Sequence, residues 1–240
     1  MRAITRGFLA CIMLVGIVGC AATQQARSVE KSGFLGDYSM LQEGKRGVIK
    51  EGSEDTALWL YKNPSADWRK YTKVYLDPVT VWIGKDSQLN KVSPEDRKTM
   101  ADMLWAKLDE SLRKDYEMTT ELGPDVMRVQ VAITEGDKSW VVLDTVSSII
   151  PQARLLSGAK SMATGVSAFT GSTSVEAKVT DGGTGDLLFA AVDRRGGTKS
   201  LRGVTNSWGD LEHAYRYWAE KSRYRLCQWR GDQNCIEPKA

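Results

Sequence analysis

The stretch that most constrains the fold of this chain is an alternating segment followed by a glycine-rich turn. From residue 173 to residue 180 apolar and polar side chains alternate, and residues 187–192 form a second apolar run after the turn at 181–185. The apolar face of the first run carries Val175, Ala177 and Val179. Because side chains alternate between the two faces of a strand, this pattern predicts an antiparallel hairpin with one buried face.

Two amphipathic helices are predicted on either side of this hairpin in the sequence. Ser93 is a good N-cap and Pro94 suits the first turn, so we expect a helix that runs to about residue 115. Its apolar face carries Met100, Met103, Leu104, Leu108 and Leu112. A second helix is expected over 207–222, with its buried face at Leu211, Ala214, Tyr215 and Trp218.

The other predicted strands complete an α+β order. Residues 73–83 form a strand interrupted at Pro78, which places it at a sheet edge or at a bulge because proline cannot donate to the ladder. Residues 126–134 form a half-buried strand, and 58–61 and 139–143 are shorter candidates. We therefore expect one α+β domain, with a mixed or antiparallel sheet and two main amphipathic helices packed on one face.

The N-terminus has the build of a signal peptide. Arg2 and Arg6 precede an apolar run, Phe8–Val18, of about 11 residues, which is too short for a bilayer that needs about 20. Ile17–Cys20 resembles the lipobox of bacterial lipoproteins. That resemblance implies cleavage before Cys20, with diacylglycerol on its sulfur and an acyl chain such as palmitate on its amine. The alternatives are an ordinary secretory peptide or a buried apolar strand.

These features divide the chain into residues 1–19 as a cleaved signal peptide, 20–32 as a lipidated N-terminus and tether, and 33–240 as one periplasmic domain. The residue after Cys20 is Ala21. In the lipoprotein class a residue other than aspartate there implies delivery to the outer membrane. The expected location is therefore the cell envelope, on the outer membrane facing the periplasm.

Composition argues against a nucleic-acid partner. The chain has 33 basic residues, which include Arg2 and Arg6 of the leader, and 30 acidic residues, so the mature chain is near neutral.

Cys227 and Cys235 remain as a pair once Cys20 is lipidated. In an exported protein they predict a disulfide; a metal site is the alternative, with poor ligand spacing and no neighbouring histidine.

Signatures of catalysis and cofactor binding are missing from the sequence. His213 is the single histidine, and no nucleophile elbow, phosphate loop or dinucleotide fingerprint is present. Asp181, Asp186 and Asp193 suggest calcium, but their spacing does not match an EF-hand and turn chemistry explains them. We expect no enzyme, no cofactor and no metal, although serine–lysine or paired-carboxylate chemistry stays open.

Eight tryptophans offer contact surfaces. Trp82 and Trp218 are expected in the core, whereas Trp68, Trp105 and Trp229 are candidates for exposed contacts with a partner or ligand.

Residues 145–172 are rich in small side chains. They are either a connection or close-packed helix without a binding role, or a docking surface.

Several stretches together resemble a known lipoprotein family. Residues 32–38 follow the tether, 74–79 start the sheet, and the small-residue segment, the hairpin and the helix at Trp218 come later. The chain resembles bacterial lipoproteins grouped as domain of unknown function 3313. The resemblance spans nearly all of the mature chain and implies a single α+β lipoprotein domain, but no mechanism.

The sequence thus predicts a non-enzymatic, lipid-anchored domain that docks an envelope protein. The alternative is a periplasmic binder of a small ligand or glycan through exposed tryptophans. An apolar pocket with converging polar groups would favour the ligand binder, and a flat exposed apolar patch would favour docking.

Overall fold

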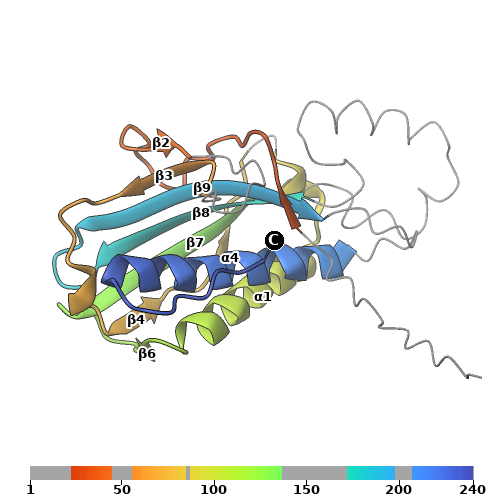
Figure 1. The fold of residues 1–240 in the computed structure, drawn as a ribbon. Helices are drawn as coiled ribbons and strands as arrows, with labels where there is room; N and C mark the ends of the chain where they lie inside the picture. The colour runs from red at the N-terminus through yellow and green to blue at the C-terminus, as the bar shows by residue number, and fades with distance from the viewer. Residues whose placement is uncertain (1–22, 45–55, 85–86, 137–171, 198–206, 240) are drawn as a thin grey trace, which may run out of the picture.

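The computed structural model describes residues 23–44, 56–84, 87–136, 172–197 and 207–239 (Figure 1). The leader, Cys20, the candidate strand 139–143 and nearly all of the small-residue segment lie outside these ranges. The described residues form an α+β domain in which two helices pack on one face of an open mixed sheet, as predicted.

The sheet has nine strands in the described ranges, in the order β2-β3-β9-β8-β7-β4-β6, with β1 paired to β9 and β5 to β7. Pairing of β4 with β6 and β7, and of β5 with β7, is parallel, and the other pairs are antiparallel. The bounds are β1 Thr23–Gln25, β2 Gln42–Glu43, β3 Trp59–Lys62, β4 Lys73–Leu76, β5 Thr80–Val81, β6 Glu117–Met118, β7 Val126–Gly136, β8 Ser172–Asp181 and β9 Leu187–Gly197.

The helices begin where the sequence signals predict. The Ser93 hydroxyl accepts a hydrogen bond from the Asp96 amide at 3.0 Å and so caps α1. The helices are α1 Pro94–Leu112 and α4 Ser207–Arg230, with short 3-10 turns η1 Trp68–Lys70 and η2 Gln88–Lys91. None of the helices in the described ranges is long and apolar enough to span a membrane.

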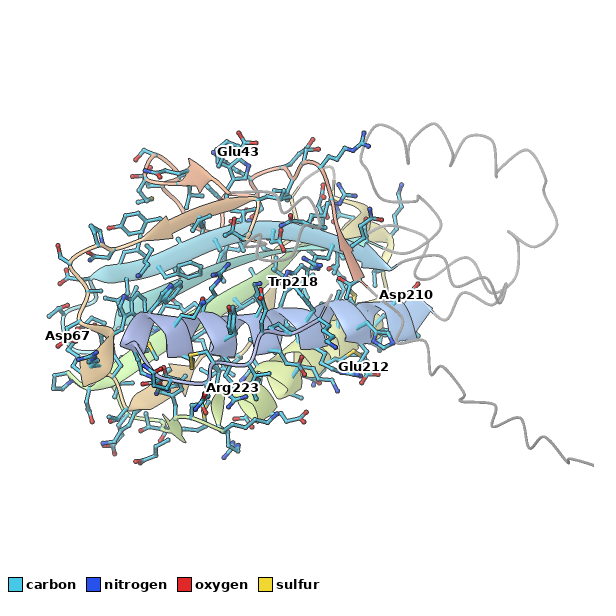
Figure 2. The ribbon with its side chains drawn as sticks, viewed as in Figure 1. Glu43, Asp67, Asp210, Glu212, Trp218 and Arg223 are labelled. Carbon is cyan, nitrogen blue, oxygen red and sulfur yellow. A yellow bond between two sulfur atoms is a disulfide. The ribbon has the colours of Figure 1, made fainter. Side chains whose placement is uncertain are left out.

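Helix α4 continues past the predicted end at residue 222. Leu226 is buried, and Trp229 packs on the core, so the apolar face extends into a stretch that is otherwise rich in arginine. Figure 2 shows Trp218 on the sheet side of α4, with Glu212 and Arg223 on the side of α1. There Glu212 pairs with Lys107 at 2.9 Å and Arg223 with Asp115 at 2.8 Å.

The predicted strand 73–83 is two strands, β4 and β5, separated at Asp77 and Pro78. β4 lies between β6 and β7 and is not at an edge. The Asp77 amide still donates to the Val129 carbonyl at 3.0 Å, so pairing with β7 continues as far as the residue before the proline, which has no N–H to donate.

The opposite face of the sheet is covered by the chain around residues 29–41. Glu176 of β8 is fully buried there, and its carboxylate accepts hydrogen bonds from the Tyr38 hydroxyl and the Ser32 amide, each at 2.6 Å. These bonds compensate the cost of burying a charge and fix the N-terminal segment on the sheet.

Strand β1 lies within residues 20–32, the segment predicted as the lipidated N-terminus and tether. Thr23 pairs with Gly197 of β9, and its hydroxyl accepts a hydrogen bond from Arg195 Nε at 2.6 Å. Ala26, just after β1, is buried. The polar side chains of β1 give no hydrophobic signal, since its place in the sheet depends on backbone pairing.

Candidate functional site

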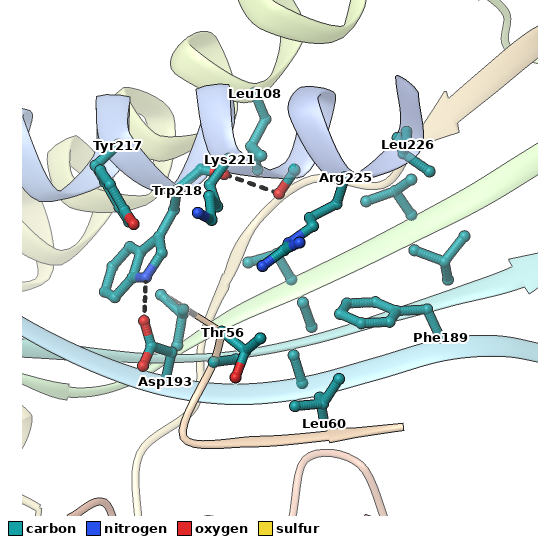
Figure 3. A pocket seen from close by; sticks show the side chains of 18 of the residues that line it. Thr56, Leu60, Leu108, Phe189, Asp193, Tyr217, Trp218, Lys221, Arg225 and Leu226 are labelled. Atoms are coloured by element: carbon teal, nitrogen blue, oxygen red, sulfur yellow. Dashed lines mark hydrogen bonds between the residues drawn. The ribbon is translucent and has the colours of Figure 1, made fainter. Parts of the chain in front are cut away.

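A cavity of about 160 Å³ lies between α4 and the sheet (Figure 3). One wall is made by leucines of α1, the floor by strands β7, β8, β9 and β3, and the roof by α4. Aromatic rings from β9 and α4 close part of it. The apolar lining includes Leu104, Leu108, Leu112, Val129, Val131, Val175, Val179, Phe189, Trp218, Leu226 and Trp229.

The cavity follows from small side chains at the centre of the floor. Ala177 of β8 lies directly opposite Ala191 of β9, and Ala191 is in turn opposite Leu60 of β3. All three line the cavity. Two neighbouring alanines at inward positions leave a space beneath α4 that valine or leucine would fill.

A buried carboxylate fixes one end of the site. Asp193 Oδ2 accepts the Trp218 indole N–H at 2.7 Å, as Figure 3 shows. Asp193 Oδ1 accepts from the Gln25 side chain at 2.7 Å and from the Leu58 amide at 3.3 Å. One side chain of β9 therefore holds α4, β1 and the chain leading to β3 in place.

Cationic groups surround this apolar space. Arg195 is buried, and its guanidinium carbon lies 3.8 Å from the centroid of the Tyr217 ring. Lys221 and Arg225 of α4 also line the cavity, and Figure 3 shows both side chains reaching from the helix toward the sheet. The lining thus combines an apolar interior with a few polar groups, which is typical of small-molecule sites.

The tryptophans predicted as exposed contacts differ in position. Trp229 is half-buried and lines the cavity, with its ring centroid 5.1 Å from that of Phe189 and 4.6 Å from that of Trp68. Trp68 is 4% exposed, so the prediction of an exposed contact there is wrong. Its polar sequence neighbours, which include Arg69, are exposed while the indole packs inward.

Two further tryptophans lie at the surface. Trp105 is 37% exposed on α1, and its role as a contact stays a prediction. Trp82 is 42% exposed, contrary to the prediction of a core position, because it follows β5 and packs edge-on against Phe34. Trp218 is buried, as predicted.

Sequence reasoning missed Lys221, Arg225 and Asp193 as members of this site. Lys221 and Arg225 are charged residues in a polar part of the sequence, and turn chemistry is sufficient to explain Asp193 there. The signal that could have found the site is the cross-strand pair of alanines, Ala177 and Ala191, at positions where a packed hairpin carries larger side chains. Within the described ranges no group of three His, Cys, Asp or Glu side chains could hold a metal ion.

Cys227 and Cys235 form the predicted disulfide, with their Cα atoms 5.8 Å apart. The bond joins α4 to the C-terminal segment 231–239. This segment returns along the helix, because Glu237 pairs with Lys221 at 2.6 Å.

Reduction of this disulfide is expected to lower the free energy of unfolding by about 2–3 kcal/mol, because the bond closes a short loop in the unfolded chain. Urea unfolding of the Cys20→Ser chain, with and without dithiothreitol, measures the change. The Cys227→Ser, Cys235→Ser double variant should match the reduced protein and be insensitive to dithiothreitol. Equal stability of the oxidised and reduced forms would contradict the prediction.

Comparison with known proteins places the chain in a family. No curated protein matches it. Among solved structures, a variant PelC dodecamer from Paraburkholderia phytofirmans is similar with 10% identity and a TM-score of 0.35, over 73% of this chain and 96% of that one. A second PelC dodecamer from the same organism gives 10% identity and a TM-score of 0.33, over 65% and 91%. A family model described as protein of unknown function (DUF3313) matches residues 30–222, and the chain belongs to this family.

Proposed function

We propose that this chain is a lipid-anchored envelope protein whose domain binds a small, largely apolar ligand between α4 and the sheet. The observation that carries the proposal is the cavity, which is apolar in its interior and bordered by a few charged side chains. The proposed activity is binding, without a reaction. The lipid on Cys20 and the place at the outer membrane are parts of the proposal that depend on the sequence alone.

The size of the cavity supports a ligand. An apolar cavity of about 150 Å³ in another protein stays dry and binds benzene. Space of this kind reduces stability by an amount on the order of a few kcal/mol, because its lining lacks packing partners. The two alanines at the centre of the cavity floor therefore make the domain less stable than larger side chains would. Ligand binding would explain why they are present.

Docking to an envelope protein, the function first expected, has less support in the described part of the chain. Its large exposed apolar side chains come from four separate segments and are Trp82, Trp105, Leu122 and Ile236. Docking therefore stays a prediction from the sequence.

The neutral fluorescent probe N-phenyl-1-naphthylamine tests the proposal. We expect saturable binding to the full Cys20→Ser chain, exported to the periplasm so that its disulfide forms. Ala191→Phe fills the centre of the cavity and should weaken probe binding by about tenfold or more. Ala177→Leu, which fills the same space from β8, should act in the same direction.

Ala106→Phe is the matched control, since Ala106 is exposed on α1 and does not line the cavity. It should bind the probe like the parent chain. Thermal unfolding shows which variants are folded. Absence of saturable binding in the parent, or equal binding by the parent and both folded filling variants, would overturn the proposal.

A further inference from the structure

We infer that the ligand is an anionic amphiphile, with its apolar chain in the cavity and a carboxylate head between Lys221 and Arg225. This inference depends on the proposed function and adds the chemical class of the ligand. It commits to a fatty-acid-like anion, in contrast to an uncharged apolar molecule of the same length.

Lys221 is an unusual side chain for the edge of an apolar cavity. Only 12% of it is exposed, and its ammonium pairs with Glu237 at 2.6 Å. A charge so far removed from water needs a counter-charge. Glu237, which is 49% exposed, supplies it from the C-terminal segment.

Arg225 lies one helical turn from Lys221, and both side chains line the cavity. Arg225 Nη1 donates to Gln228 Oε1 at 2.9 Å, and a guanidinium carries five N–H donors in a planar fork. Like charges at this spacing on a helix repel each other. A carboxylate between them relieves the repulsion and can accept two hydrogen bonds from arginine.

The charge of the lining favours an anion. Arg195, Lys221 and Arg225 contribute positive charge, and Asp193 is the acidic residue of the lining. Asp193 already accepts hydrogen bonds from Trp218, Gln25 and Leu58. These bonds hold β1, the chain before β3 and α4 to β9.

Glu237 is the internal competitor of the ligand. The disulfide Cys227–Cys235 ties its segment to α4, and the Glu237 carboxylate occupies the Lys221 ammonium. A bound carboxylate takes over this ion pair, and Glu237 moves into solvent. Removal of the Glu237 charge therefore strengthens binding of an anion and leaves binding of a neutral molecule unchanged.

The test compares decanoate with decan-1-ol as competitors of N-phenyl-1-naphthylamine at neutral pH, below the micellar range of decanoate. In the full Cys20→Ser chain we expect decanoate to bind about tenfold more tightly than the alcohol, because charge-assisted hydrogen bonds are stronger than neutral ones. Lys221→Gln and Arg225→Gln should each remove most of this preference and leave the alcohol affinity within about twofold. Glu237→Gln should tighten decanoate binding alone, by a few fold.

Lys98→Gln is the control, because Lys98 is exposed on α1 and pairs with Asp102 outside the cavity. It should keep the preference for decanoate. Equal affinities for decanoate and decan-1-ol in the parent chain would overturn this inference while the proposed function stands. Failure of the probe and both competitors to bind would overturn the proposed function as well. A preference for decanoate that survives in folded Lys221→Gln and Arg225→Gln chains would overturn the assigned head site.

Discussion

Asp181→Ala is expected to lower the free energy of unfolding by about 3 kcal/mol, because it removes a buried carboxylate that accepts four hydrogen bonds. Asp181 Oδ2 accepts from Lys70 Nζ at 2.5 Å and from the Tyr71 hydroxyl at 2.9 Å. Its Oδ1 accepts from the amides of Gly183 at 2.7 Å and Thr184 at 3.0 Å. The variant leaves the buried Tyr71 hydroxyl and the turn amides without this acceptor. Urea unfolding at neutral pH measures the loss.

The effect of Asp181 should depend on pH. Burial raises the pKa of this carboxyl, but the hydrogen bonds from Lys70, Thr184, Gly183 and Tyr71 outweigh burial and hold the pKa below its ordinary value. Because the unfolded chain binds the proton more tightly, the stabilisation is full above the ordinary carboxyl pKa and is lost as the pH falls below about 4. The difference between the parent and Asp181→Ala should shrink in that range.

Asp186→Ala is the matched control in the same turn. Asp186 is exposed, and its side chain accepts from the Thr184 hydroxyl at 2.8 Å. Its removal should change the free energy of unfolding by less than about 0.5 kcal/mol. An equal loss in the free energy of unfolding for the two aspartate variants would contradict the stabilising role of the hydrogen bonds to Asp181.

Asp193→Ala is expected to cost a similar amount, about 3 kcal/mol, and to weaken probe binding as well. The variant leaves the indole N–H of Trp218 buried without its acceptor and releases Gln25 and Leu58. The wall of the cavity that Trp218 forms then loses its fixed orientation. Urea unfolding and the fluorescence titration measure the two effects.

A double-mutant cycle isolates the bond between Asp193 and Trp218. Trp218→Phe keeps an aromatic ring and removes the N–H, so the losses from Asp193→Ala and Trp218→Phe should combine to less than their sum. Asp102→Ala, which removes an exposed carboxylate of α1, is the control and should be nearly neutral. Additive losses would contradict a direct bond between the two side chains.

Local signals in the sequence were sufficient for much of the fold. The hairpin of β8 and β9 depends on alternation over neighbouring residues, and the start of α1 depends on one serine and one proline. Both are interactions over a few positions. The end of α4 is not predicted because, beyond residue 222, arginines at 223, 225 and 230 flank Leu226 and Trp229 and weaken the apolar periodicity.

Features that depend on distant partners could not be read in this way. The parallel pairing of β4 with β7 joins segments about fifty positions apart, and the hydrogen bond from Trp218 to Asp193 joins α4 to β9. The cavity likewise depends on residues that are far apart in the sequence. It exists because Ala177 and Ala191 face each other in the register of β8 and β9, beneath a helix from another part of the chain.

If Cys20 carries lipid, as proposed, strand β1 limits the distance between the domain and the bilayer. Its first residue, Thr23, is the third after Cys20. Even a fully extended chain covers at most about 11 Å over three residues. With lipid on Cys20, the domain would lie against the membrane surface, because no long flexible linker would separate it from the lipid. Since Thr23 contacts Arg195 of the cavity directly, a lipid-derived anion would have only a short path from bilayer to site.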